Sequence, residues 1–149
     1  MPQPSTLEVR VRFPSSVLYC IMRRVNTVKK GRLGEAAVAH EFVRQGYDVY
    51  LPVFGNANFD MVVVKEGILS RVEVKSTSYK GSKKSYAVQL KSVRHNTNET
   101  RVIKFDGNKS DLLAVYIVPE NRVVILNSSD HHGKTVTHIE GTAQGANRS

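Results

Sequence analysis

The sequence predicts an α/β fold, in which one helix is followed by two β-hairpins. A 3.6-residue recurrence of apolar positions indicates the helix over residues 29–46. Val-rich runs at residues 59–64 and 70–77 indicate the first hairpin, and runs at 111–118 and 122–127 indicate the second. A chain of 149 residues with 40% hydrophobic composition is long enough to bury a core. We therefore expect one domain.

The predicted helix carries three alanines and ends at Gly46, a residue type that favours the position just after a helix C-terminus. Glu35 stands in an i, i+4, i+7 row with Ala39 and Phe42. It should therefore lie on or beside the buried stripe of the helix. The alternative is a first-turn glutamate that only interacts with the helix dipole and has no further role.

The first hairpin carries acidic residues where strands usually have none. Residues 65–67 supply its turn. Glu73 and Lys75 are two positions apart, so they share one face of their strand, and the valines beside them share the other face. Asp60 opens a strand whose next four residues are apolar, as in the middle of a covered sheet. The hairpin could thus bring Asp60, Glu73 and Lys75 into one cleft.

The other segments are predicted from turn residues and apolar runs. Residues 119–121 should form the turn of the second hairpin, and residues 86–94 could be either a strand or a short helix. We expect a strand at 47–54 that ends near Pro52, and loops at 78–85, 94–101 and 106–110.

The two ends of the chain should lie outside the folded domain, which we expect to span residues 29–140. Residues 1–28 form an uncertain extension, although residues 7–13 alternate like a short strand. The apolar run at 16–22 is too short to span a membrane, and no positive charge precedes it as in a signal peptide. We therefore expect a soluble, cytoplasmic protein with no membrane partner. Residues 141–149 should be a disordered tail.

The charge balance indicates a polyanionic partner. Lys and Arg number 22 against 13 Asp and Glu, which gives a net charge of +9. Nucleic acid is the simplest such partner, and a merely soluble basic protein is the alternative. Cys20 is the one cysteine, so there is no intrachain disulfide framework and no Cys-rich zinc site. The histidines show no metal-ligand spacing with it.

Asp60 and Glu73 on neighbouring strands would suit a hard divalent cation such as Mg²⁺, which takes oxygen ligands. Such a cation can activate water and act as a Lewis acid on a phosphate. Lys75 on the same face could orient the attacking water or stabilise developing negative charge. The alternative is an exposed hairpin face on which Glu73 and Lys75 are ordinary solvated charges.

Three short motifs stand in order along the chain, at residues 34–39, 58–60 and 72–75. With them the sequence resembles the PD-(D/E)xK nuclease superfamily over roughly residues 29–127. Phe59 stands where the name of the family has proline. The resemblance implies a central mixed β-sheet flanked by helices, with a restriction-endonuclease-like core in the order αβββαβ.

The resemblance also implies roles for individual residues. Asp60 and Glu73 would be metal ligands, and the Val74 carbonyl would be a further ligand. Lys75 would be the catalytic lysine, and Glu35 would be an acid on the helix that supports the metal site. One or two Mg²⁺ ions per active site are implied.

Within the superfamily, the sequence is similar to intron-encoded homing endonucleases and to archaeal-type Holliday junction resolvases. Residues 45–52 and 111–116 look closer to the first group. We therefore expect a Mg²⁺-dependent endodeoxyribonuclease on double-stranded DNA, of the homing type. A junction resolvase and a non-catalytic basic nucleic-acid-binding domain are the alternatives. Cutting both strands suggests a dimer or tetramer of identical chains. Candidate DNA contacts are the basic residues Lys80, Lys83, Lys84, Lys91, Arg94, Arg101, Lys104 and Lys109.

Overall fold

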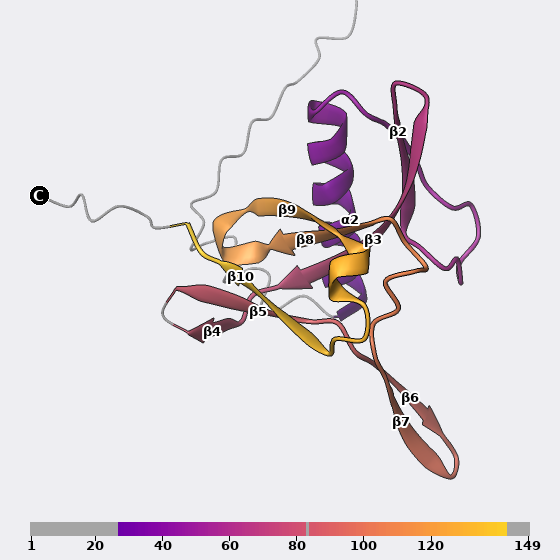
Figure 1. The fold of residues 1–149 in the computed structure, drawn as a ribbon, viewed down its shortest axis with the longest axis vertical. Coiled ribbons are helices and arrows are strands. Elements are labelled where there is room, and N and C mark those ends of the chain that lie inside the picture. Colours follow the sequence, from indigo (N-terminus) through magenta and orange to yellow (C-terminus); the bar gives the residue numbers. More distant parts are fainter. Residues whose placement is uncertain (1–26, 83, 143–149) are drawn as a thin grey trace, which may run out of the picture.

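The computed structural model describes residues 27–82 and 84–142, which are arranged around a five-stranded sheet (Figure 1). Its strands pair antiparallel except for β3 and β8, which are parallel, so the sheet is mixed. The α/β class with a central mixed sheet is therefore confirmed. In spatial order the strands are β1 (Asp48–Tyr50), β2 (Met61–Lys65), β3 (Ile68–Thr77), β8 (Leu112–Ile117) and β9 (Arg122–Asn127).

The helix α2 (Thr27–Arg44) ends in a Schellman motif. Gly46 adopts φ +85° and donates its N–H to the Val43 carbonyl, and the Tyr47 N–H bonds the Phe42 carbonyl. The rings of Phe42 and Tyr47 then meet edge to face, with their centroids 5.1 Å apart. The predicted role of Gly46 as the helix stop is confirmed.

Both predicted hairpins are confirmed. The β2–β3 turn places Glu66 at φ 52° and Gly67 at φ 77°, the paired positive values of a type I′ turn. The β8–β9 connection runs through the short 3₁₀ helix η1 (Val118–Glu120) and Asn121. Asn121 adopts the left-handed region and accepts a hydrogen bond from the Tyr116 hydroxyl. A second 3₁₀ helix, η2 (Ser128–His131), follows β9.

The central sheet buries both of its faces. On one face Val38 and Phe42 of α2 pack against Met61, Val63 and neighbouring residues of the sheet. On the other face alternate residues of β8 pack against a second sheet. The spatial order of this sheet is β10–β5–β4 (Figure 1). The strands of this second sheet are β4 (Lys80–Ser82), β5 (Ser85–Gln89) and β10 (Val136–Glu140).

The segment between β3 and β8 differs most from expectation. Its described residues form four strands and the loops between them, and contain no helix, where the order αβββαβ places a second helix. Residues 94–101, predicted as a loop, belong to a two-stranded sheet of β6 (Ser92–Asn96) and β7 (Glu99–Ile103). These strands are exposed on both faces, so they lack the apolar alternation that identifies a strand in sequence. The predicted loop at 78–85 contains β4 and the start of β5, and the undecided segment 86–94 is divided between β5 and β6, with two residues between them.

Several predictions lie outside the described residues. They concern the strand at 7–13, the apolar run at 16–22, the tail over residues 143–149, and the side chain of Lys83. Within the described part of the chain, no helix has the length and apolar content needed to cross a bilayer.

Candidate active site

Asp60 directly precedes β2, at the point where β3 continues beyond its pairing with β2. The ladder between these strands begins at the pair Met61 and Val72, and β3 continues to Thr77 beyond it. The Asp60 N–H donates to the Val72 carbonyl at 2.9 Å. Asp60 Oδ2 then accepts the Val74 N–H at 2.7 Å. The carboxylate of Asp60 thus replaces the missing strand as the partner of the β3 edge.

Glu73 and Lys75 lie on the face of β3 that points away from α2. They are paired in register with Leu113 and Val115, which pack toward the second sheet, whereas Val74 packs toward the helix. Lys75 Nζ and Glu73 Oε1 are 2.7 Å apart. The side chains are 31% and 20% exposed respectively, so the pair is partly shielded from water. The predicted sharing of one face is confirmed.

Glu35 reaches the same region from α2. It is half-buried in the first half of the helix, on the stripe that continues to the buried Phe42. Burial raises the pKa of the Glu35 carboxyl, and the negative charge of Asp60 raises it further, while Arg32 opposes both effects. Glu35 is therefore an electrostatic neighbour of Asp60.

Gly34 allows α2 to lie close to β3 beside this carboxylate. A Cβ at position 34 would overlap the Ser76 hydroxyl and would lie 3.8 Å from Val74 Cγ1. The glycine is buried. A larger side chain would therefore move either the helix or Ser76, and with the helix the position of Glu35.

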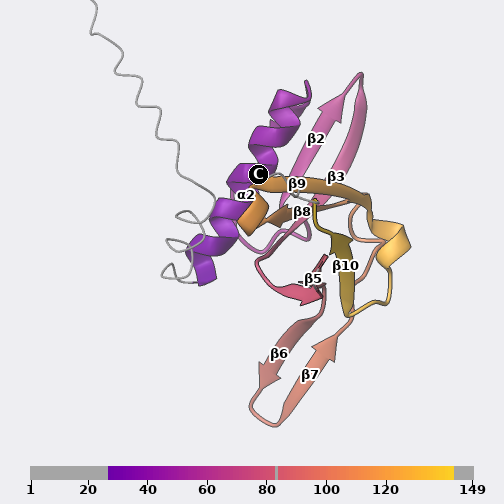
Figure 2. The same cartoon turned by 90° about the vertical axis from the view of Figure 1, so that its left-hand side faces the viewer.

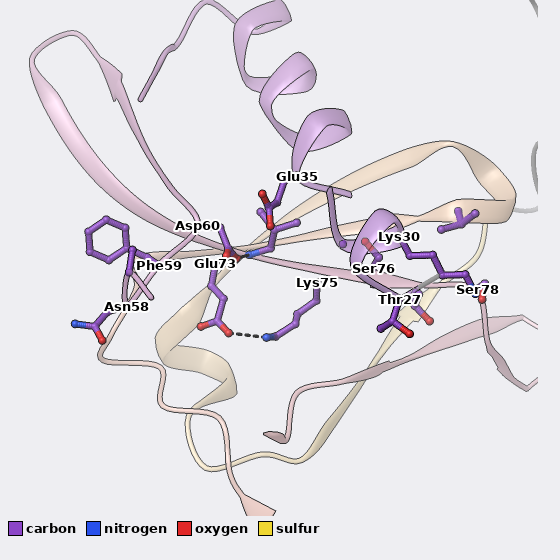
Figure 3. Close-up of a pocket in the computed structure, with 15 residues that line it drawn as sticks. Thr27, Lys30, Glu35, Asn58, Phe59, Asp60, Glu73, Lys75, Ser76 and Ser78 are labelled. Atoms are coloured by element: carbon purple, nitrogen blue, oxygen red, sulfur yellow. Dashed lines mark hydrogen bonds and ion pairs between the residues drawn. The ribbon is translucent and has the colours of Figure 1, made fainter. Parts of the chain in front are cut away.

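One pocket of about 470 Å³ contains all the residues predicted for the site, with Asp60 between Glu35 and the Glu73–Lys75 pair in the view of Figure 3. Val74 also lines it. The structure therefore brings together four side chains that are separated by up to 40 positions in sequence. The predicted members are Glu35, Asp60, Glu73, Val74 and Lys75.

The pocket has further polar lining residues that the sequence analysis did not select. On α2 they are Thr27 and Lys30, with Gly31 beside them, and the spacing of 27, 30, 31 and 35 is that of one helix face. That spacing could have identified them, because the stripe of Glu35 simply extends toward the start of the helix. Asn58 and Ser78 line the pocket from the segments before β2 and after β3, for which no periodic signal exists.

The carboxylates of the pocket are ligands of the kind that a hard cation binds, although they do not converge on one point. Among residues 27–82 and 84–142, no three His, Cys, Asp or Glu side chains converge as a metal-binding group. The reason is geometric, since Glu73 is held by Lys75 on one face of β3 and Glu35 approaches from the other. Two carboxylates with waters and substrate are nevertheless the usual Mg²⁺ environment. Asp60 and Glu73 are two carboxylates that line this pocket.

The residues predicted to contact DNA lie elsewhere. No described member of that set lines the pocket. Lys80 lies over the Tyr86 ring at 6.0 Å, and Arg101 pairs with Glu99 at 3.1 Å. Four of the set, Lys91, Arg94, Arg101 and Lys104, are exposed on or beside the β6–β7 pair.

Comparison with known proteins identifies the family. The PD-(D/E)XK endonuclease family matches residues 25–149, which is most of the sequence. The chain belongs to this family. The predicted resemblance to PD-(D/E)xK nucleases is thereby confirmed, and the protein is a nuclease whose family implies DNA as the substrate.

Two similar proteins extend this result. Protein 5.3 of Escherichia phage T7 is 28% identical over 113 residues, which cover 70% of this chain and 83% of the phage protein. The structure of a bacterial homing endonuclease, I-Ssp6803I, superposes with a TM-score of 0.70 at 21% identity, over 83% of each chain. The second likeness confirms the fold of this PD-(D/E)XK protein.

Proposed function

We propose that the protein is a metal-dependent endodeoxyribonuclease that hydrolyses phosphodiester bonds in duplex DNA, with residues 29–140 as its nuclease domain. The observation that carries the proposal is the single pocket that contains Glu35, Asp60, Glu73 and Lys75. Three carboxylates and a lysine in one pocket are the groups that phosphodiester hydrolysis requires for binding a cation and for stabilising negative charge.

Each residue of the pocket has a distinct role in this proposal. Asp60 and Glu73, with the Val74 carbonyl, would hold one or two Mg²⁺ ions. A bound Mg²⁺ would supply a more acidic water and a Lewis acid for the phosphate oxygens. A carboxylate has two oxygens, so the pairing of Glu73 Oε1 with Lys75 would still leave Glu73 able to act as a metal ligand.

Lys75 and Glu35 act beside these ligands. The pairing with Glu73 fixes the Lys75 ammonium at the pocket, where it can orient the attacking water or stabilise the charge on the phosphate. Glu35 adds negative charge next to Asp60, which favours a cation there. The pKa of Glu35 is raised chiefly by burial and secondly by the charge of Asp60.

A homing role is the finer proposal. It is supported by the similarity of fold to a protein described as a bacterial homing endonuclease. The residues that the structure describes form one such pocket around these side chains, so cleavage of both strands suggests at least two copies, and we propose a homo-oligomer.

The test is cleavage of supercoiled plasmid with Mg²⁺ and with a chelator, using the wild type, Lys75→Ala and a matched lysine variant, Lys134→Ala, at an exposed lysine that neither lines the pocket nor belongs to the candidate DNA contacts. We expect cleavage by the wild type and by Lys134→Ala, and none with chelator or with Lys75→Ala. Binding of DNA by Lys75→Ala should persist. Cleavage that survives in Lys75→Ala would refute the assigned site.

A synthetic four-way junction should be offered beside linear duplexes in the same assay. Symmetrical cutting of the junction with no cutting of any duplex would refute the proposed duplex substrate and would favour the resolvase. Cutting of a long duplex at one sequence is the expected result for a homing enzyme.

A further inference from the structure

The β6–β7 pair is a ribbon that stands apart from both sheets (Figures 1 and 2). Each of its strands has five residues, all exposed. At about 3.4 Å per residue the ribbon projects by about 17 Å. An isolated hairpin is at best marginally stable in water, so its persistence as an unsupported arm needs a reason.

The base of this ribbon is firmly attached to the protein. Leu90 and Phe105 flank it and are buried in the core, 3% and 4% exposed. The Leu90 N–H donates to the Thr135 carbonyl at 2.9 Å, and the Phe105 N–H donates to the Lys134 carbonyl at 3.0 Å. The base of the ribbon is therefore fixed in the core, and its two strands project into solvent.

The two faces of the ribbon differ in charge. Paired residues of an antiparallel ladder lie on one face, and successive pairs alternate between faces. Arg94 is paired with Arg101, so both guanidinium groups project from one face. The opposite face carries the pair Val93 and Val102, which are 44% and 55% exposed.

The arginine pair is unfavourable for the isolated protein. Like charges directly opposite each other in a ladder are destabilising. Glu99 pairs with Arg101 at 3.1 Å, but both side chains are mostly exposed, and such ion pairs contribute little. Residues 91–104 contain four basic residues and one acidic residue, which gives this segment a net charge of +3. An anionic partner would turn this repulsion into attraction.

We propose that the β6–β7 ribbon inserts into the major groove of duplex DNA with its Arg94 and Arg101 face toward the nucleic acid. The major groove is about 12 Å wide and 8.5 Å deep, and it admits a two-stranded β-ribbon. The ribbon is long enough to cross that depth. Arginine can bind guanine edges with two hydrogen bonds or contact phosphates. This inference rests on the proposed function, since it gives the nuclease a contact with its substrate outside the catalytic pocket.

The test measures duplex binding in a Lys75→Ala background, so that cleavage does not interfere. Arg94→Gln with Arg101→Gln should weaken binding at least about tenfold. The slope of log K against log salt concentration should fall by about 1.8, which corresponds to two lost cationic contacts. Arg44→Gln is the matched control, because Arg44 also pairs with a glutamate of its own element and is exposed, but on α2. It should change neither quantity.

A second control uses the other face of the ribbon. Val93→Thr with Val102→Thr keeps β-branched side chains and removes apolar surface. Under the proposal it leaves DNA affinity nearly unchanged. The contrary outcome is that light scattering shows the valine variant in a smaller assembly than the parent, while the arginine variant binds DNA normally. The ribbon is then a contact between copies, and the proposal is wrong.

The failure of this inference can be distinguished from failure of the proposed function. Arginine variants that bind as tightly as the parent, in a protein whose wild type cuts plasmid with Mg²⁺, overturn the ribbon proposal alone. In the Lys75-containing protein, the arginine variant should raise KM and leave kcat nearly unchanged, because the pocket is intact. A large loss of kcat with unchanged KM would also overturn the proposal.

Discussion

Substituting Asp60 separates its structural role from its chemical role. In Asp60→Asn the amide oxygen can still accept the Val74 N–H, which Asp60 Oδ2 accepts at 2.7 Å. The hydrogen bond changes from a charged to a neutral acceptor, so we expect a cost of about 1 kcal/mol. The loss of repulsion toward Glu35 offsets part of this cost. In Asp60→Ala the half-buried N–H loses its partner, with an expected cost of about 1–3 kcal/mol.

Urea unfolding and plasmid cleavage measure these two roles independently. Both variants should lose cleavage, whereas only Asp60→Ala should lose much stability. In Asp60→Asn the pKa of Glu35, followed by NMR titration, should fall because the neighbouring negative charge is absent. The reasoning is refuted if Asp60→Asn cuts DNA at the wild-type rate, or if the two variants are equally stable.

Three further predictions concern the surroundings of this carboxylate. The raised pKa of Glu35 means that its ionised form is disfavoured in the folded protein, so Glu35→Gln should be more stable than wild type at pH 7. Thermal melts should show that advantage shrinking as the pH falls through the raised pKa of Glu35, and gone once the pH is below the ordinary value of 4.5. Gly34→Ala should reduce cleavage because the added methyl group meets Ser76, and Ser76→Ala should restore it; a double variant no better than the single one would contradict the proposed contact. Arg71 lowers the pKa of Asp111 through a two-point ion pair, so the stabilising effect of Asp111 should be present at pH 7 and lost as the pH falls below 3.8. Denaturant titrations of Asp111→Asn should then show a deficit at pH 7 that vanishes in acid, and a deficit independent of pH would exclude this origin.

The elements of the site could be predicted because each has a local pattern. The i, i+4, i+7 row placed Glu35 beside the stripe that ends at Phe42, and the structure shows it half-buried there. Strand alternation placed Glu73 and Lys75 on one face, where they pair at 2.7 Å. Periods of 3.6 and 2 residues act within a segment, so they need no knowledge of its neighbours.

Two features had no such pattern. The β6–β7 strands bury neither face, and alternation of hydrophobicity is only informative where one face is buried. Lys91 and Arg101 were therefore assigned to separate segments, one undecided and one a loop, although both lie on or beside the same ribbon. The segment that contains β5 was left undecided between strand and helix for a related reason, since β5 is buried along its central residues and does not alternate.

By itself the sequence determined the helix, the acidic hairpin and the family to which they point, because capping, turn chemistry and side-chain period are properties of short segments. Only the tertiary structure decided that Glu35 and Glu73 approach the β3 edge from opposite faces, with Asp60 at the strand end between them (Figure 3). That arrangement depends on contacts between distant residues: Gly34 against Ser76, and the parallel pairing of β3 with β8, which Arg71 and Asp111 join across 40 positions. Such contacts are fixed by packing and register, and no period within a single segment encodes them.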